Sequence, residues 1–224
     1  MNHVLRGSSA HVVVESLDAP SLDETDAHHL ARVLRLQVDD VVTATDGNGS
    51  WVATRWTRDG GLQPIGEIIV GPPRRGLAVA CAIAKGDRNE LVVQKLTELG
   101  LDRIVLFEAT RSVVRWDRER QARQLDRLRR IAREAAMQSR RVHLPEVVVA
   151  DFAAVAQMAA VALAEPDADD RIGPSVSAVA VGPEGGFAPG ELAQVERRVR
   201  LTDTILRVET AAIAAGAALV AAHT

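Results

Sequence analysis

The stretch Ala178–Phe187 reads AVAVGPEGGF and predicts a buried strand that ends in a glycine-rich loop. Three glycines and a proline leave little side-chain bulk in this loop, so a ligand can approach its backbone N–H and C=O groups. A second segment, Ile205–Ala211 (ILRVETA), follows after one helix-length spacer and runs into an Ala-rich stretch. Two backbone-lined loops at neighbouring strand ends suit a flat, polar, nucleoside-like ligand.

A plain turn is the alternative for this loop, since Gly-Pro-x-Gly-Gly after a strand is typical of turns. Two phosphate-binding motifs are excluded, because neither GxGxxG nor GxxxxGK[ST] occurs at this position. The rest of the chain decides between a turn and a binding loop.

Composition indicates a soluble globular protein. The 224 residues are 47% hydrophobic and 25% charged, enough for one large or two modest domains. No apolar stretch reaches membrane-spanning length and no signal-peptide pattern opens the chain, so we expect a cytoplasmic protein that does not enter membranes. The single cysteine, Cys81, lies in an apolar run and is predicted to be a core residue. The six histidines show no metal-ligand spacing with it, so no metal site is expected.

The net charge of −3 hides a strong asymmetry. Between Arg111 and Arg141 there are eleven arginines and four acids, a local balance of +7 against −10 elsewhere. Concentrated arginine indicates an anion-facing surface, and phosphate backbone is its common target. The alternative is a solvated helix with ordinary ion pairs. Arginine can also stack on bases, which matters in a chain without tyrosine.

The chain divides near Gly71–Gly76 (GPPRRG), because two prolines between glycines favour an extended linker. The part before it is predicted to be mostly β, with one helix at Glu24–Leu34 whose apolar stripe is Leu30, Val33 and Leu34. Short strands and one helix in about 70 residues are typical of a small barrel, often a nucleic-acid-binding module. The predicted strands are His11–Glu15, Val41–Asp46, Trp51–Thr57 and Ile65–Val70.

After the linker, strands alternate with helices, which predicts a parallel sheet covered on both faces. Ligands of such sheets bind at the carboxyl ends of the strands, where both loop segments fall. Asp87–Glu90 is predicted to form a capping box, and Gly100 to end the helix that follows. The predicted strands are Leu77–Ala84, Arg103–Phe107, Val147–Ala150, Ala160–Ala164, Ala178–Val181 and Thr204–Leu206. The further predicted helices are Arg118–Ser139 (with Leu125, Leu128, Ala132 and Ala135 inward), Phe152–Met158, Pro189–Val199 and Glu209–Ala222.

Six motifs, in order and at consistent spacing, carry a resemblance to a known family. They are His28–Leu36 (HHLARVLRL), Lys85–Asp87 with Gln94–Gly100 (KGD and QKLTELG), Arg111–Val113 (RSV), Ala132–Ser139 (AREAAMQS), Val181–Phe187 and Leu206–Ala211. On these residues the chain resembles the RsmE-type ribosomal RNA uridine-N3 methyltransferases of the SPOUT class, which use S-adenosylmethionine. The chain departs from the family pattern at Thr202, Thr204 and Val208, which replace a glycine, an arginine and a threonine, and at Asp39, which replaces a common glycine.

The resemblance implies an α/β fold in two domains. Residues 1–72 would form a small PUA-like β-barrel that binds RNA. Residues 73–224 would form a SPOUT-type parallel sheet whose C-terminal segment passes through a loop as a deep trefoil knot, a rare exception to unknotted topology. The resemblance also implies a homodimer in which each site borrows residues from the partner.

The resemblance further implies an S-adenosylmethionine site, a substrate and a reaction. The expected substrate is small-subunit (16S) ribosomal RNA within the assembled subunit, methylated at N3 of a uridine. Arg111 would stabilise the developing uracil anion and Glu209 would accept the N3 proton, while structural roles for both side chains remain open. The expected cofactor-binding residues are Leu163, Glu165, Gly182, Pro183, Glu184, Gly185, Gly186, Ile205, Leu206, Val208, Thr210 and Ala211. The expected RNA-binding residues are His29, Arg32, Arg35, Arg129, Arg130, Arg133 and Arg140.

Two rival functions stay open at this point. One is a SPOUT methyltransferase that modifies another base or a ribose of a different RNA. The other is a non-catalytic RNA-binding or assembly factor that retains the knot.

Overall fold

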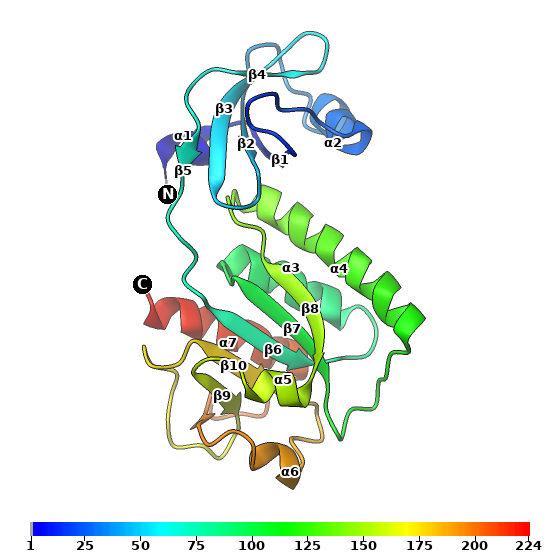
Figure 1. Ribbon diagram of the computed structural model, residues 1–224, viewed down its shortest axis with the longest axis vertical. Coiled ribbons are helices and arrows are strands. Elements are labelled where there is room, and N and C mark those ends of the chain that lie inside the picture. The colour runs from blue at the N-terminus through cyan, green and yellow to red at the C-terminus, as the bar shows by residue number, and fades with distance from the viewer. Residues whose placement is uncertain (1) are drawn as a thin grey trace. The chain divides into compact units, whose positions relative to one another are not determined.

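The computed structural model describes residues 2–224, which pack as two compact units (Figure 1). Unit 1 comprises the chain up to Arg74 together with Arg133–Leu144, and unit 2 comprises Arg75–Ala132 with Pro145–Thr224. No helix among residues 2–224 is both long and apolar enough to cross a membrane.

Unit 1 is built on a five-stranded mixed sheet in the order β1-β2-β3-β4, with β5 also paired to β3. The β1–β2 pair is parallel and the other pairs are antiparallel. The core of this sheet contains Val12, Val42, Val52 and Trp56. The five strands confirm the prediction that the first part of the chain is mostly β. The elements are α1 (His3–Gly7), β1 (Ala10–Val13), α2 (Glu24–His28), η1 (His29–Val33), β2 (Val41–Thr45), β3 (Ser50–Trp56), β4 (Leu62–Pro64) and β5 (Ile69–Val70).

The predicted apolar stripe of the helix in unit 1 is wrong at two of its three residues. Leu30 is buried, but Val33 and Leu34 are 60% and 45% exposed. The helix changes from α to π geometry at His29, where the Leu34 N–H donates to the His29 carbonyl at 3.0 Å. This i→i+5 bond adds a residue to the turn and rotates the following side chains away from the core.

The segment Arg133–Leu144 completes unit 1 through polar contacts. Arg133 Nη2 lies 2.6 Å from Asp26 Oδ2 and also donates to the Val13 carbonyl at 3.0 Å. His11 is buried, with Nδ1 2.8 Å from Thr43 Oγ1 and Nε2 3.0 Å from the Arg141 carbonyl. Burial lowers the pKa of His11 to about 4, because an imidazolium would lose its hydration there.

Unit 2 is built on a six-stranded sheet in the order β11-β9-β10-β6-β7-β8, and every pair in it is parallel. The predicted parallel sheet is therefore confirmed. Its elements are β6 (Ala78–Ala82), α3 (Arg88–Leu99), β7 (Arg103–Glu108), α4 (Arg118–Gln138, which continues into unit 1), β8 (Glu146–Asp151), α5 (Phe152–Ala156), β9 (Val161–Ala164), β10 (Ala178–Val181), α6 (Pro189–Leu192), β11 (Arg198–Val199) and α7 (Val208–Ala222).

Alternating side chains of this sheet form two separate cores. Val79 and Cys81 of β6 point to the face where α3, α4 and α7 contribute Leu96, Leu128 and Leu219. The intervening residues join a second cluster that contains the aromatic trio Phe107, Phe152 and Phe187. Burial raises the pKa of the Cys81 thiol to about 12, as expected for a core residue rather than a nucleophile.

Three local predictions for unit 2 are wrong. Asp87 is the N-cap of α3 but makes no side-chain cap bond; Asn89 instead exchanges hydrogen bonds with both backbone groups of Ala84 at 2.9 Å. The predicted helix Pro189–Val199 ends at Leu192, and its last two residues form the edge strand β11. The predicted strand Thr204–Leu206 is a loop. Gly100 does end α3, in a left-handed conformation with φ 92°.

Candidate cofactor and active site

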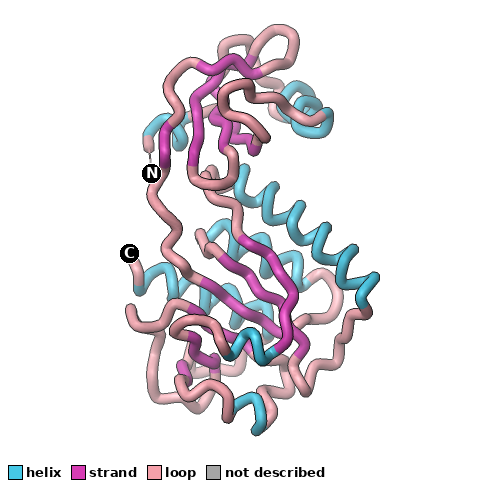
Figure 2. The backbone as a smooth tube through the Cα atoms, viewed as in Figure 1, coloured by secondary structure: helices cyan, strands magenta, loops and turns pink. Residues whose placement is uncertain are grey.

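A pocket of about 320 Å³ lies at the carboxyl ends of β9, β10 and β11. Figure 2 draws the loops that follow these strands in pink. The position of the pocket agrees with the rule for ligands of parallel sheets. Its first wall is Ala164–Pro166, its second is Val181–Glu184 with Gly186, and its third is Leu201, Thr202, Thr204–Val208 and Ala211.

Strand register decides which side chains face the pocket. Ala164 of β9 pairs with Val181 of β10, and both line the pocket. Leu163 pairs with Ala180, and both belong to the core on the opposite face of the sheet. Leu163 was expected to bind the cofactor, but its fully buried side chain faces away from the pocket.

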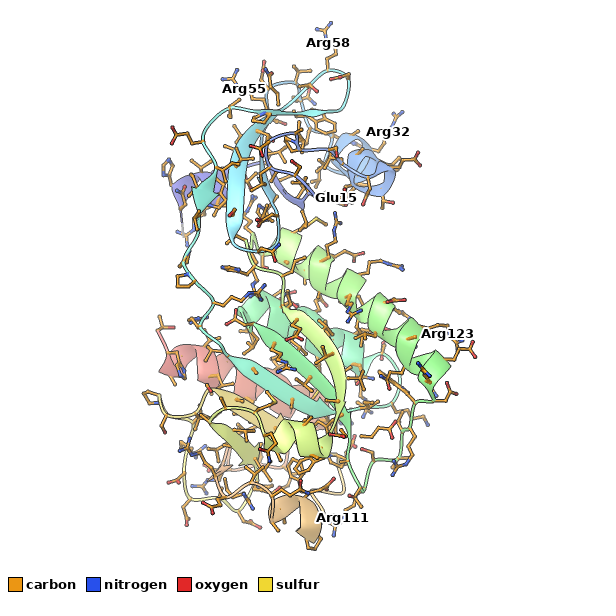
Figure 3. The ribbon with its side chains drawn as sticks, viewed as in Figure 1. Glu15, Arg32, Arg55, Arg58, Arg111 and Arg123 are labelled. Atoms are coloured by element: carbon orange, nitrogen blue, oxygen red, sulfur yellow. The ribbon has the colours of Figure 1, made fainter. Side chains whose placement is uncertain are left out.

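The glycine-rich loop combines a tight turn with an open surface. The Gly186 N–H donates to the Pro183 carbonyl at 2.8 Å, and Gly186 has φ +68°, a conformation that favours glycine. A Cβ built on Gly186 would meet no atom within 4 Å, so this residue presents bare backbone to the pocket. Gly185 does not line the pocket; its carbonyl accepts a hydrogen bond from Arg111 Nη1 at 2.9 Å (Figure 3).

The third wall is an irregular loop held by side chains instead of strand pairing. Arg171 Nη1 donates to the Leu201 carbonyl at 2.8 Å, and Arg171 Nη2 lies 3.0 Å from Asp203 Oδ1. Thr202 Oγ1 donates to the Thr204 carbonyl at 2.8 Å. These bonds satisfy the carbonyls of Leu201 and Thr204 without strand pairing. Both threonines, the departures from the family pattern, line the pocket.

Two acidic side chains have different positions relative to the pocket. Glu165 lines it; burial raises the pKa of this carboxyl, and the nearby Arg198 partly lowers it. Glu209 lies in the first turn of α7 beside the pocket but outside its lining, with its side chain 13% exposed. Its Oε2 is buried and has no hydrogen-bond partner among the described residues. Thr210, another expected cofactor residue, is exposed and also lies outside the lining.

The structure separates the expected RNA-binding arginines into two groups. Arg133 is bound to Asp26, and that hydrogen bond raises its pKa. Arg140 donates to the hydroxyl of Ser8 and, at 2.6 Å, to the Ser8 carbonyl. The guanidinium groups of Arg133 and Arg140 therefore make internal contacts in unit 1, and a role of either residue in RNA binding stays a prediction.

The remaining expected RNA-binding residues lie on exposed surface. His29, Arg32 and Arg35 are exposed on η1 and the turn after it. On α4, Arg129 Nε reaches the Val147 carbonyl at 3.4 Å, and Arg130 is exposed without a hydrogen bond or ion pair among residues 2–224. Several neighbours on this helix are paired with acids, as Arg127 is with Glu90 at 3.0 Å, so ion-paired arginines lie on the same helix as Arg130.

Comparison with known proteins assigns the family. A family model described as an RNA methyltransferase domain matches residues 72–220, and an RNA methyltransferase PUA domain matches residues 22–55. A Mycobacterium tuberculosis protein named ribosomal RNA small subunit methyltransferase E is 34% identical over 87% of this chain and 83% of its own length. This chain belongs to the ribosomal RNA small subunit methyltransferase E family. A Bacillus subtilis member of that name is 28% identical over 92% of this chain and 91% of its own.

A solved structure extends the family match to three dimensions. The ribosomal RNA small subunit methyltransferase E of Neisseria gonorrhoeae, bound to S-adenosyl methionine, aligns with a TM-score of 0.77 at 25% identity, covering 93% of this chain and 95% of that one. Sequence reasoning missed four lining residues that lie outside the segments assigned to the cofactor: Pro166, Leu201, Thr202 and Thr204. These residues could have been found from the rule that the carboxyl ends of neighbouring parallel strands meet, but only with β11 recognised as a strand.

No group of three His, Cys, Asp or Glu side chains in the described part of the chain could hold a metal ion.

Proposed function

We propose that this protein is an S-adenosylmethionine-dependent methyltransferase that methylates N3 of a uridine in small-subunit (16S) ribosomal RNA, in the cytoplasm. The observation that carries the proposal is the pocket at the carboxyl ends of β9, β10 and β11, which lies within the span matched by the methyltransferase family model. The related Neisseria gonorrhoeae enzyme of the same fold binds S-adenosyl methionine.

The residues around the pocket suit this cofactor. Its volume of about 320 Å³ falls within the range of small-molecule sites, ~300–1,000 Å³. Apolar side chains such as Val181, Leu206 and Val208 offer surface for a base, and the open backbone at Gly186 allows close approach. Glu165 offers carboxylate oxygens to hydroxyl or ammonium donors.

The chain's own residues would position and deprotonate the uracil. Bound S-adenosylmethionine would supply the activated methyl group, so the protein needs no metal for this chemistry. Uracil N3 carries a proton at neutral pH and becomes a nucleophile as that proton leaves. Arg111, held at the glycine loop by Gly185, would stabilise negative charge on the uracil oxygens. Glu209, with an unpartnered Oε2, would accept the proton.

We also propose the architecture that this reaction would use. Residues 1–72 would act as a PUA-like RNA-binding barrel, consistent with the PUA-domain match at residues 22–55. Residues 73–224 would form the knotted SPOUT domain, whose last helix, α7, packs against α3, β6 and β10. Two such chains would pair as a homodimer. Val113 and Ile205, 93% and 82% exposed, are apolar groups near the site that a partner chain would cover.

Methyl transfer to defined substrates tests the reaction. Small subunits from a bacterial strain that lacks the modification would be incubated with the protein and labelled S-adenosylmethionine, and the product nucleoside identified by mass spectrometry. We expect N3-methyluridine in small-subunit rRNA. Methylation of a ribose or another base would identify a different RNA specificity. Cofactor binding without transfer to any RNA, or no cofactor binding at all, would favour an assembly factor.

Salt-dependent binding tests the RNA surface. Arg129→Glu with Arg130→Glu should weaken RNA binding and flatten its dependence on salt, because each lost phosphate contact lowers the slope by about one. Arg103→Glu with Glu146→Arg, which reverses a surface pair 3.1 Å apart in unit 2, is the control with no net charge change. An unchanged slope in the α4 variant would show that this face is only solvated.

A further inference from the structure

Arg88 connects two segments that border the pocket. It is the first residue of α3 and follows the carboxyl end of β6, the strand beside β10. Arg88 Nη1 lies 3.1 Å from Glu184 Oε1, and Arg88 Nε lies 3.7 Å from Glu209 Oε1. Glu184 belongs to the glycine-rich loop and Glu209 to the first turn of α7. One guanidinium therefore bridges a carboxylate of the pocket lining, Glu184, and the carboxylate of Glu209, which lies beside the opposite wall.

The glycine-rich loop, unlike the helical first turn of α7, depends on outside contacts for its position. The loop Gly182–Gly186 contains three glycines, so its backbone has little conformational preference of its own. Glu184 lines the pocket in this loop, and Glu209 stands between Val208 and Ala211, which line the opposite wall. Without a cation between them the two carboxylates would repel each other and favour wider separation of the walls. The planar fork of arginine suits two acceptors, whereas a lysine ammonium is a point charge.

The second carboxylate distinguishes this arrangement from an ordinary surface pair. Glu184 is 58% exposed, but the side chain of Glu209 is only 13% exposed, so Arg88 is the cation that compensates a largely buried acid. We infer that Arg88 is a positioning residue that sets the separation of the glycine-rich loop from the first turn of α7, and thereby controls cofactor affinity. This inference rests on the proposed function only in naming S-adenosylmethionine as the ligand.

The test compares four single variants and one double variant, Arg88→Gln with Glu184→Gln, of the full-length protein. Arg88→Gln removes both contacts, Arg88→Lys keeps the charge, and Glu184→Gln removes one acceptor. Arg103→Gln is the matched control, because Arg103 forms a similar pair with Glu146 at 3.1 Å where β7 and β8 begin, away from the pocket. Calorimetry measures S-adenosylmethionine affinity, hydrogen exchange measures amide protection without ligand, and steady-state kinetics at saturating cofactor measures methyl transfer.

We expect Arg88→Gln to weaken cofactor affinity about three- to tenfold, the effect of losing a partly exposed ion pair. Amides of Gly182–Gly186 should exchange faster in Arg88→Gln and Glu184→Gln than in wild type, while both variants remain folded at the assay temperature. Arg88→Lys should recover part of the affinity, and the Arg88→Gln, Glu184→Gln double variant should bind no more weakly than Arg88→Gln alone. Arg103→Gln should change none of these readouts.

Two results would overturn the inference. Unchanged loop exchange in Arg88→Gln would mean that Arg88 does not hold the loop, whether or not the protein binds the cofactor. Unchanged cofactor affinity with a reduced kcat would assign Arg88 to the chemical step instead of positioning. A wild-type protein that binds no S-adenosylmethionine would contradict the proposed function, and the exchange data would still decide the positioning role.

Discussion

Two glycine-rich turns of this molecule have similar sequences and different physical roles. Gly49, in the GNG turn between β2 and β3 of unit 1, has φ +113°, and a Cβ there would lie 2.4 Å from His143 Cε1. Gly186, in the GPEGG loop of unit 2, has φ +68° and nothing within 4 Å of its Cβ position. The first glycine is required because protein atoms pack against it. The second lines the pocket with no atom packed against it, so its place in the lining, and not internal packing, indicates a role in ligand binding.

The largest expected effect comes from filling the space at Gly186. Gly186→Val should reduce S-adenosylmethionine affinity at least a hundredfold, because the branched side chain would occupy the pocket wall; calorimetry measures this. Gly86→Val is the control, since Gly86 has φ +76°, equally open surroundings and no place in the lining. Both variants carry similar backbone strain, of order 1–3 kcal/mol. Equal S-adenosylmethionine affinities of Gly186→Val and Gly86→Val would contradict a role of Gly186 in ligand binding.

The opposite result is expected at the packed turn. Gly49→Ala should destabilise the protein by about 2–3 kcal/mol, from the strained φ and from displacement of His143. Its cofactor affinity should stay at the wild-type value below the melting temperature. Gly66→Ala, with open space and an ordinary φ in the same unit, should melt close to wild type. Denaturant unfolding distinguishes the variants, and a stable Gly49→Ala would show that the turn tolerates a side chain.

Acidification should weaken the packed region of unit 1. His11, which binds the Arg141 carbonyl, has a pKa lowered from 6.5 to about 4 by burial. Below pH 6.5 the His11 imidazole binds a proton in the unfolded chain but not in the folded chain. The free energy of unfolding therefore falls as the pH falls from about 6.5 towards 4. The loss from this group between pH 7 and pH 5 is about 2 kcal/mol. In His11→Asn, the free energy of unfolding in urea should fall less between pH 7 and pH 5 than it does in wild type. The same fall in both proteins would contradict the assignment to His11.

The smallest expected effect concerns the outer side of the GPEGG loop. Arg111→Ala removes the hydrogen bond to the Gly185 carbonyl and should weaken cofactor affinity only a few-fold, about 1 kcal/mol. Methyl transfer should fall much further if Arg111 stabilises the uracil anion. Arg115→Ala, which removes an exposed pair with Glu108 in the same segment, is the control. Equal losses in binding and transfer would limit Arg111 to supporting the loop.

Continuous apolar runs predicted the buried strands well. The bounds predicted for Ala178–Val181 are those observed, and the predicted strand Leu77–Ala84 differs from β6 by one or two residues at each end. Both succeed because strands covered on both faces have an unbroken apolar sequence. β11 was missed because an edge strand of two residues has no periodic pattern. Thr204–Leu206 resembles a strand in sequence, yet it forms a loop in which Thr202 Oγ1 donates to the Thr204 carbonyl, a contact that no periodic pattern reveals.

The pocket could be located from sequence more reliably than its lining could be assigned. Glycines after a buried strand indicated the right strand ends. The direction of the Leu163 side chain, however, follows only from the strand register that pairs Leu163 with Ala180. The arginines of α4 show the same limit. Composition indicated an anion-binding helix, whereas the tertiary fold determines that Arg133 is bound to Asp26 and that Arg130 has no ion pair within residues 2–224.

The division of the chain between the units has a consequence for the order of synthesis. Residues up to Arg74 leave the ribosome well before Arg133–Leu144, yet both belong to unit 1. Until the later segment is available, Asp26 lacks Arg133 and His11 lacks the Arg141 carbonyl. Unit 1 is therefore a discontinuous domain whose nascent form stays incomplete while unit 2 begins to be made. An excised fragment that ends at Arg74 would carry an unpaired buried carboxylate in place of a finished fold.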